Sequence, residues 1–194
     1  MKLKAPLILA SGSPRRSELL SAAGLDFEVL VRNVEEFVDE DLAPRALAVM
    51  LSEHKGKAYD DLSPKNIVIT ADTLVSFRGK ILNKPADEQE AIHMLEMLSG
   101  NTHLVVSGVS IFHKGKFTSF AEETKVTFRK LRRDTIEHYV SVYRPFDKAG
   151  GYGIQEWIGM VGISGIEGDY YNVMGLPVAR LYEELRALSS KRED

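Results

Sequence analysis

Short apolar runs alternate along the chain with segments in which apolar residues recur at helical spacing. Uniformly apolar residues 7–10 predict a first buried strand, and residues 67–72 predict another that ends in a carboxylate. Residues 27–31 predict a strand between them, and residues 73–82 predict a further strand with a turn at Arg78 and Gly79. The apolar pattern therefore predicts a β-sheet.

Two longer strand-like runs follow, at residues 103–112 and 117–128, and Lys114, Gly115 and Lys116 separate them. A short connection that contains glycine is typical of a β-hairpin. One more strand is expected around residues 160–166. Part of the sheet is therefore expected to be antiparallel.

Helical spacing of apolar positions predicts five helices, at residues 14–23, 44–59, 87–98, 134–143 and 177–187. Ser13 fits the N-cap of the first, and Gly24 and Gly100 fit the ends of the first and third. Asp134 and Glu137 have the spacing of an N-cap acid and its partner. Because helices and hairpins interleave, we expect an α/β fold with a mixed sheet flanked by helices, as a single domain over residues 1–194.

Composition narrows the function classes. The 194 residues carry a net charge of -3, which gives no sign of the broad basic surface of a nucleic-acid binder. The chain has no cysteine, so disulfides, zinc–thiolate sites and cysteine nucleophiles are excluded. Its first apolar stretch is too short for a signal peptide, and nothing in the sequence approaches a membrane span. These features predict a soluble cytoplasmic protein without a nucleic-acid or membrane partner.

The loop after the first strand has the features of an anion-binding site. The backbone amides of Gly12 and Ser13, with Ser11, would lie at a helix N-terminus, which favours negative charge. Arg15 and Arg16 lie in that first turn, where cations are unfavourable unless an anion sits between them. The loop therefore favours a phosphate ligand. The alternative is an ordinary capped helix with two solvated arginines.

Carboxylates predict a place for a divalent cation. Asp72 would end a buried strand, where a charge is costly unless a metal or cation compensates. One or two acids of the loop 33–41 could join it around magnesium or manganese, which take oxygen ligands; the candidates are Glu35, Glu36, Asp39, Glu40 and Asp41. The alternatives are a turn aspartate and a solvated acidic run.

Two lysines and a glutamine complete the set of candidates. Lys55 and Lys84 could add cations for a phosphate chain, and Pro85 would hold Lys84 extended. Gln155, in a glycine-rich loop, offers a donor and an acceptor to a base. Both lysines could equally be solvated surface residues, and the five histidines show no metal-ligand spacing, so they are expected to be structural or exposed.

Taken together, these motifs resemble those of the Maf family of nucleoside triphosphate pyrophosphatases. The shared segments occur in the same order along nearly the whole chain: L-A-S-G-S-P-R-R-S-E-L-L, the pair Glu35 and Glu36, T-A-D-T, N-K-P, D-K-A-G-G-Y-G-I-Q and N-V-M-G-L-P. The resemblance implies an elongated α/β fold similar to the inosine-triphosphate pyrophosphatases, with a cleft between two lobes. It also implies a divalent metal, and it suggests a homodimer.

The resemblance further implies hydrolysis of a nucleoside triphosphate to the monophosphate and pyrophosphate. Arg15, Thr73 and Gln155 match the branch of the family that acts on dTTP and UTP, and Asp72 takes the catalytic place. Two alternatives stay open. One is a sister enzyme for 7-methyl-GTP or another non-standard nucleotide. The other is a regulator of septum formation that binds nucleotide without turnover.

Overall fold

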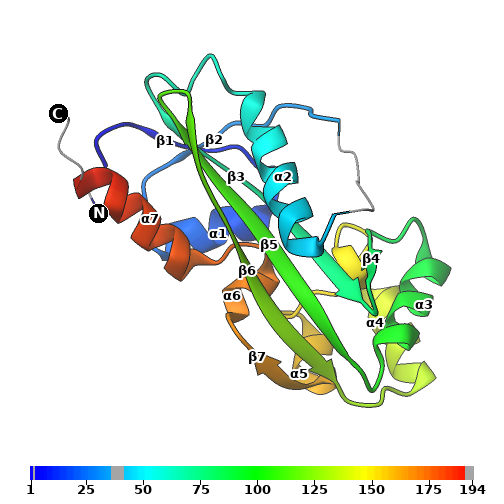
Figure 1. Cartoon of the computed structure of the whole chain (residues 1–194). Coiled ribbons are helices and arrows are strands. Elements are labelled where there is room, and N and C mark those ends of the chain that lie inside the picture. Colours follow the sequence, from blue (N-terminus) through cyan, green and yellow to red (C-terminus); the bar gives the residue numbers. More distant parts are fainter. Residues whose placement is uncertain (2, 36–41, 191–194) are drawn as a thin grey trace. The chain divides into compact units, whose positions relative to one another are not determined.

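The computed structural model describes residues 1, 3–35 and 42–190, and Figure 1 shows the course of the chain. The strands are β1 (Leu7–Leu9), β2 (Glu28–Val29), β3 (Ile67–Phe77), β4 (Lys80–Leu82), β5 (Thr102–His113), β6 (Lys116–Phe128) and β7 (Ile163–Glu167). The helices are α1 (Pro14–Ala22), α2 (Pro44–Lys57), α3 (Glu88–Leu98), α4 (Arg133–Tyr143), the 3-10 turn η1 (Ala149–Gly151), α5 (Trp157–Gly162), α6 (Tyr170–Met174) and α7 (Val178–Ser190). None of the described helices is long and apolar enough to cross a membrane.

The strands form one mixed sheet, as the sequence pattern predicts. The order is β2-β1-β3-β5-β6-β7, and β4 pairs with β3 beside this path. Strand β1 runs parallel to β2 and β3, whereas β4 and β7 pair antiparallel with β3 and β6. The predicted α/β fold with a mixed sheet flanked by helices is therefore confirmed.

The chain divides into two compact units. Unit 1 comprises Met1–Asp72, Ser107–Glu122 and Gly175–Asp194, and unit 2 comprises Thr73–Val106 and Glu123–Met174. The three long strands β3, β5 and β6 each pass from one unit into the other. Each unit has a core of its own.

Within unit 1, α2 covers one face of the strands, and α1 and α7 cover the other (Figure 1). The connection from β1 to β2 contains α1, and the connection from β2 to β3 contains α2. Because such crossovers are almost always right-handed and these two run in opposite directions across the sheet, their helices are expected on opposite faces. A core cluster of this unit contains the buried residues Ile8, Ala10, Tyr59, Val68 and Phe112. Burial of these apolar side chains stabilises the strands that carry the phosphate-loop candidates.

Within unit 2, α3 packs against α4 and η1, and a larger apolar core lies beneath them. That core contains Leu95, Leu98, Val126, Phe128 and Tyr139, among other buried residues. The amphipathic pattern of residues 87–98 fits this role, and Asp87 caps α3 by accepting a hydrogen bond from the Glu90 amide at 2.9 Å.

Local turn chemistry is confirmed at both predicted hairpin turns. Arg78 and Gly79 have φ of 51° and 79°, and Lys114 and Gly115 have φ of 50° and 69°. Two consecutive residues with positive φ match the twist of an antiparallel pair. Gly24 and Gly100, with φ of 70° and 72°, follow the ends of α1 and α3 as expected.

Two predictions about elements are wrong, and a third is confirmed in part. Asp72 does not end a strand, because β3 continues unbroken from Ile67 to Phe77 and no glycine or proline interrupts it. Asp134 is not the N-cap of α4, since the helix begins at Arg133 after Arg132, so Asp134 lies in the first turn. The strand expected around residues 160–166 is present as β7, but it begins only at Ile163, because Trp157–Gly162 is the helix α5.

Candidate functional site

Asp72 and Lys55 form an ion pair in unit 1. The Lys55 ammonium donates a short hydrogen bond to Asp72 Oδ1, from the last turns of α2 to the middle of β3. The side chains are 17% and 12% exposed, so the pair is largely buried but reaches water. A lysine and an aspartate that sequence reasoning assigned separately to phosphate and to metal therefore lie in direct contact.

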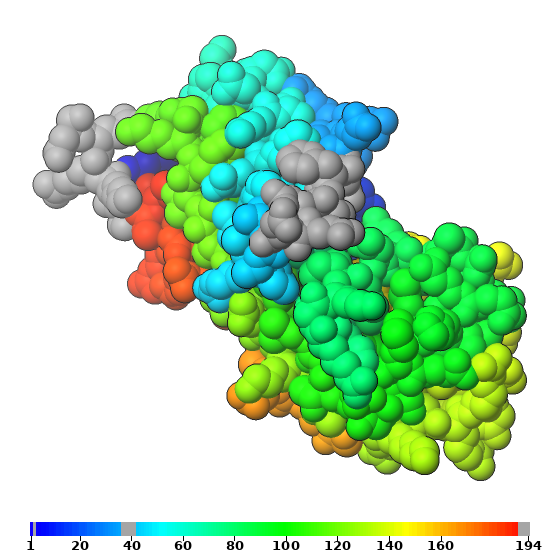
Figure 2. Space-filling view, turned by 45° about the vertical axis from the view of Figure 1, so that its right-hand side comes forward, coloured from blue at the N-terminus to red at the C-terminus, as the bar shows by residue number. Residues whose placement is uncertain are grey.

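The close approach of α2 to the sheet is what brings Lys55 to Asp72. A Cβ on Gly108 of β5 would lie 2.1 Å from the carbonyl oxygen of Ala48, so only glycine allows the helix to sit there. Buried hydroxyls join the two layers, because Thr70 donates to the Ser52 carbonyl at 2.6 Å and the Ser52 and Ser110 hydroxyls lie 2.6 Å apart. The outer face of α2 (cyan) forms part of the surface in Figure 2.

The loop between β1 and α1 lies beside Asp72 in the register of the sheet. Leu9 pairs with Ile69 in parallel, so the residues that follow Leu9 run alongside those that lead to Asp72. Ser13 is the N-cap of α1, and Pro14 begins the helix, as predicted. The Ser13 side chain makes no capping hydrogen bond, while the Ser13 amide donates to Ser11 Oγ at 3.3 Å.

The two arginines of the loop differ in their surroundings. Arg16 donates from Nε to the Gly175 carbonyl at 2.9 Å and from an Nη to Ser11 Oγ at 3.0 Å. These bonds tie the loop to the segment that leads into α7. Arg15 is half-buried in the first turn of α1. Arg16 therefore has an organising role in the loop, and its contact with substrate stays a prediction.

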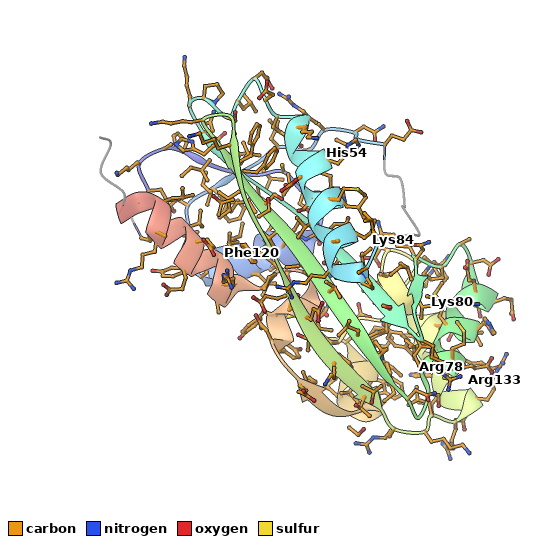
Figure 3. The ribbon with its side chains drawn as sticks, in the orientation of Figure 1. His54, Arg78, Lys80, Lys84, Phe120 and Arg133 are labelled. Atoms are coloured by element: carbon orange, nitrogen blue, oxygen red, sulfur yellow. The ribbon has the colours of Figure 1, made fainter. Side chains whose placement is uncertain are left out.

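The start of the acidic loop is anchored to the end of α2. Tyr59 donates its hydroxyl to the Leu30 carbonyl and accepts the Arg32 amide, at 2.9 and 2.8 Å. The Arg32 guanidinium binds both carboxylate oxygens of Asp61, and this hydrogen bonding lowers the pKa of Asp61. A ring nitrogen of His54, labelled in Figure 3, lies 3.1 Å from the Glu35 carbonyl oxygen.

The carboxylates predicted to hold a metal are only partly described. Glu35 is exposed, and Glu36 lies outside the described residues. Across the described ranges, no group of three or more His, Cys, Asp or Glu side chains could hold a metal ion. Magnesium is commonly bound by one or two carboxylates together with substrate phosphates, and Asp72 fits the protein's part of such a set. The divalent cation stays a prediction.

In unit 2, two of the predicted segments are joined. The Gly150 amide donates to the Asn83 carbonyl at 3.1 Å, which links the glycine-rich loop to the N-K-P segment. Lys84, between β4 and α3, is exposed, and Pro85 beside it is buried (Figure 3). Gln155 is exposed in a turn, and Thr73 is half-buried on β3. These residues are accessible, as groups that contact a substrate must be.

Unit 2 contains a largely buried ionic network that was not predicted from the sequence. Lys148 Nζ lies 2.6 Å from Asp147 Oδ1 and 3.1 Å from Glu156 Oε1. Tyr139 donates to the other oxygen of Glu156 and accepts the Gly153 amide at 3.0 Å. The sequence does contain a signal for this network, because a lysine and a glutamate flank the glycine-rich stretch that contains Gln155.

Comparison with known proteins finds relatives that match this chain over most of its length. A dTTP/UTP pyrophosphatase of Phocaeicola vulgatus is 46% identical over 187 residues, which cover 95% of this chain and 97% of that protein. Proteins of the same name from Cytophaga hutchinsonii and Bacillus cereus are each 47% identical, covering 94% and 93% of this chain and 84% and 94% of theirs. A solved HAM1 protein from Coxiella burnetii has a TM-score of 0.42 and 11% identity, over 64% of this chain and 73% of that one.

The family described as Maf-like protein matches residues 6–188, which include every segment on which the resemblance was based. With that match and with relatives at 46–47% identity over nearly their whole length, this chain belongs to the Maf family.

Proposed function

We propose that this protein hydrolyses dTTP and UTP to the nucleoside monophosphate and pyrophosphate. The name shared by its relatives supports the substrate class. The structural observation that carries the proposal is the Lys55–Asp72 pair, which the register of β1 and β3 sets alongside the loop of Ser11, Gly12 and Ser13. A carboxylate next to a phosphate-binding loop fits hydrolysis, because a pure phosphate binder gains nothing from a buried acid.

In this proposal, unit 1 supplies the groups for the triphosphate. Arg15, Arg16 and the amides of Gly12 and Ser13 would bind phosphate oxygens, since a helix N-terminus and guanidinium groups both favour anions. Lys55 would neutralise charge as well. A positive group that is already bound to Asp72 can shift toward a phosphate and leave the carboxylate available to water.

The reaction is a displacement at phosphorus. A water oxygen attacks the α-phosphorus, the bond from that phosphorus to the bridging oxygen breaks, and pyrophosphate leaves with the electron pair. Asp72 orients the water and takes up its proton, a role that typically accelerates a reaction by about 10²–10⁴-fold. Arg15 and Arg16 would stabilise the charge that develops on the leaving pyrophosphate.

A divalent cation is part of the proposal. Asp72, with Glu35 or Glu36, would hold magnesium or manganese, and such an ion supplies charge neutralisation at phosphate oxygens. For base selection, we propose that Thr73 and Gln155 contact the pyrimidine. A site that recognises the polar edge of a base by paired hydrogen bonds discriminates strongly, because the wrong base leaves buried polar groups of the site unpaired.

The test is product analysis of the purified protein with dTTP and a divalent cation. We expect dTMP and pyrophosphate in equal amounts. Formation of dTDP and inorganic phosphate would contradict the proposal, and tight binding without products would favour the regulatory alternative. A panel with UTP, CTP, GTP and 7-methyl-GTP separates this protein from sister enzymes. An enzyme of the dTTP/UTP branch is expected to hydrolyse UTP and dTTP in preference to the other three nucleotides.

Apolar side chains on unit 2 support the proposal of a homodimer. Met160 and Val161 of α5, Ile166 of β7, and Tyr170 and Tyr171 of α6 are exposed. Clusters of exposed apolar residues commonly mark interaction surfaces. Sedimentation equilibrium measures the mass in solution, and Met160→Glu is expected to shift a dimer of 21.6 kDa chains toward the monomer.

A further inference from the structure

The network of Tyr139, Lys148 and Glu156 closes the loop that carries Gln155. Lys148 and Glu156 lie at the two ends of this loop, and their side chains meet at 3.1 Å. The Lys148 side chain is 10% exposed and that of Glu156 is 19% exposed, so the contact is largely buried. An ion pair between the ends of a loop restricts the conformations of all residues between them.

Tyr139 fixes the middle of the same loop from α4. Its hydroxyl donates to Glu156 Oε2 and accepts the Gly153 amide at 3.0 Å. Burial and the contact with Glu156 raise the pKa of Tyr139, so the phenol stays protonated and remains a donor. A Cβ on Gly153 would lie 2.8 Å from Glu156 Cδ, which shows how closely the loop backbone wraps this carboxylate.

Gln155 is the exposed residue within this closed loop. Ile154 on one side of it is buried, and Glu156 on the other is held on both carboxylate oxygens. The backbone that carries Gln155 is therefore fixed on both sides. A glutamine amide can match either a uracil edge or a cytosine edge by turning over, because it has one acceptor and one donor group. Selection between these bases needs a glutamine held in one place.

We propose that Tyr139, Lys148 and Glu156 are positioning residues that set base selectivity through Gln155. The inference rests on the proposed function, and it assigns the substrate choice of that site to residues that do not touch substrate. Buried ion pairs are often no more stabilising than apolar residues of similar size, so their presence here fits a role in fixing one conformation. Because Gln155 would contact the base and not the reacting phosphorus, its positioning should change discrimination between bases more than it changes the chemical step.

The central experiment compares Tyr139→Phe with the wild-type enzyme on dTTP and dCTP. The ratio of kcat/KM for dTTP to that for dCTP is expected to fall about tenfold, while kcat for dTTP falls less than about threefold. Tyr143→Phe is the matched control, because Tyr143 stacks on Tyr139 from the same helix with ring centroids 5.1 Å apart. This control is expected to leave the ratio unchanged. An unchanged ratio in Tyr139→Phe would overturn the proposal.

A double-mutant cycle separates positioning from general damage. In a Gln155→Ala background, Tyr139→Phe is expected to change the ratio no further, because the residue through which it acts is gone. Additive effects of the two substitutions would contradict the proposal. Glu156→Gln serves as a second variant if Tyr139→Phe folds poorly, since it keeps an acceptor for Tyr139 but removes the charge that holds Lys148.

Hydrogen exchange of the Gly153 amide provides a readout that does not depend on activity. In Tyr139→Phe this amide loses its acceptor, and its exchange is expected to accelerate at least tenfold, while the Tyr143→Phe protein exchanges like the wild type. Unchanged exchange would overturn the positioning role. If the wild-type protein releases no pyrophosphate from any nucleotide, the proposed function fails, whereas the exchange result still decides whether the network holds the loop.

Discussion

The two units each contain a largely buried lysine–carboxylate pair, but the pairs do different things. Lys55 and Asp72 are 17% and 12% exposed, and Lys148 and Glu156 are 10% and 19% exposed, so burial does not distinguish them. The first pair joins a helix to the middle of a strand, and the second joins the ends of a loop. The carboxylate of Glu156 is bound on both oxygens by Lys148 and Tyr139, which suits a structural clamp. Our two proposals therefore assign the same kind of ion pair to a reactive position in one unit and to a positioning network in the other.

The largest expected effect is the loss of activity in Asp72→Asn. The amide keeps the shape and a hydrogen-bond acceptor for Lys55 but cannot take up a proton or carry negative charge, so pyrophosphate release from dTTP should fall by about 10²–10⁴-fold. The melting temperature should change by only a few degrees. Near-normal turnover would show that the Lys55–Asp72 pair is structural, like its counterpart in unit 2.

Lys148→Met should have its main effect on stability. It leaves the largely buried charge of Glu156 without its lysine, and breaking a buried pair in this way costs about 3 kcal/mol. Urea unfolding measures this loss, and Lys55→Met should lose a similar amount, because the Asp72 side chain is at least as buried as that of Glu156. The double change Lys148→Met with Glu156→Leu should recover much of the stability, because no charge is then left buried. Failure to recover would mean that the network contributes more than charge balance.

Acid should weaken unit 2 through His103. This side chain is 3% exposed and stacks on Phe128, and burial lowers its pKa to about 4 from 6.5. The unfolded chain binds a proton as the pH falls below about 6.5, while the folded protein stays neutral until about pH 4, so folding stability decreases across this window. The loss amounts to about 3 kcal/mol by pH 4, since one pKa unit corresponds to about 1.4 kcal/mol.

Fluorescence of Trp157 measures this effect in unit 2, because the chain has one tryptophan and it packs against the core of that unit. Urea titrations at pH 7 and pH 4 should differ less in His103→Gln, which keeps a hydrogen-bonding group for the Tyr152 hydroxyl but does not titrate. Equal acid sensitivity in this variant would assign the acid response to another group.

The smallest expected effect is that of Arg16→Lys in unit 1. An ammonium group cannot reproduce both the bond to the Gly175 carbonyl and the bond to Ser11 Oγ, so the variant should lose about 1 kcal/mol of stability. KM for dTTP should rise a few-fold while kcat changes less, because the loop is loosened but the charge remains. A large fall in kcat would show that the reacting phosphates need the guanidinium geometry of Arg16 and not its charge alone.

Much of the architecture follows from local sequence signals. Pro14 after Ser13 begins α1, because the proline ring fixes φ at a helical value. The pairs Arg78–Gly79 and Lys114–Gly115 form the two hairpin turns, because glycine adopts positive φ without strain. Asp72 shows the limit of such signals. The change from apolar to mixed residues at this position suggested a strand end, but strand pairing carries β3 on to Phe77.

The sequence by itself determined the family, the order of the longer helices and of the strands, and the residue types available for binding phosphate. Only the tertiary structure decided which charges meet. Lys55 reaches Asp72 because Gly108 lets α2 lie against the sheet, and Tyr139 reaches Glu156 because α4 packs beside the loop that follows it. Each of these two hydrogen bonds joins residues 17 positions apart in the chain. Their partners are set by the packing of whole elements, which no local pattern of residues records.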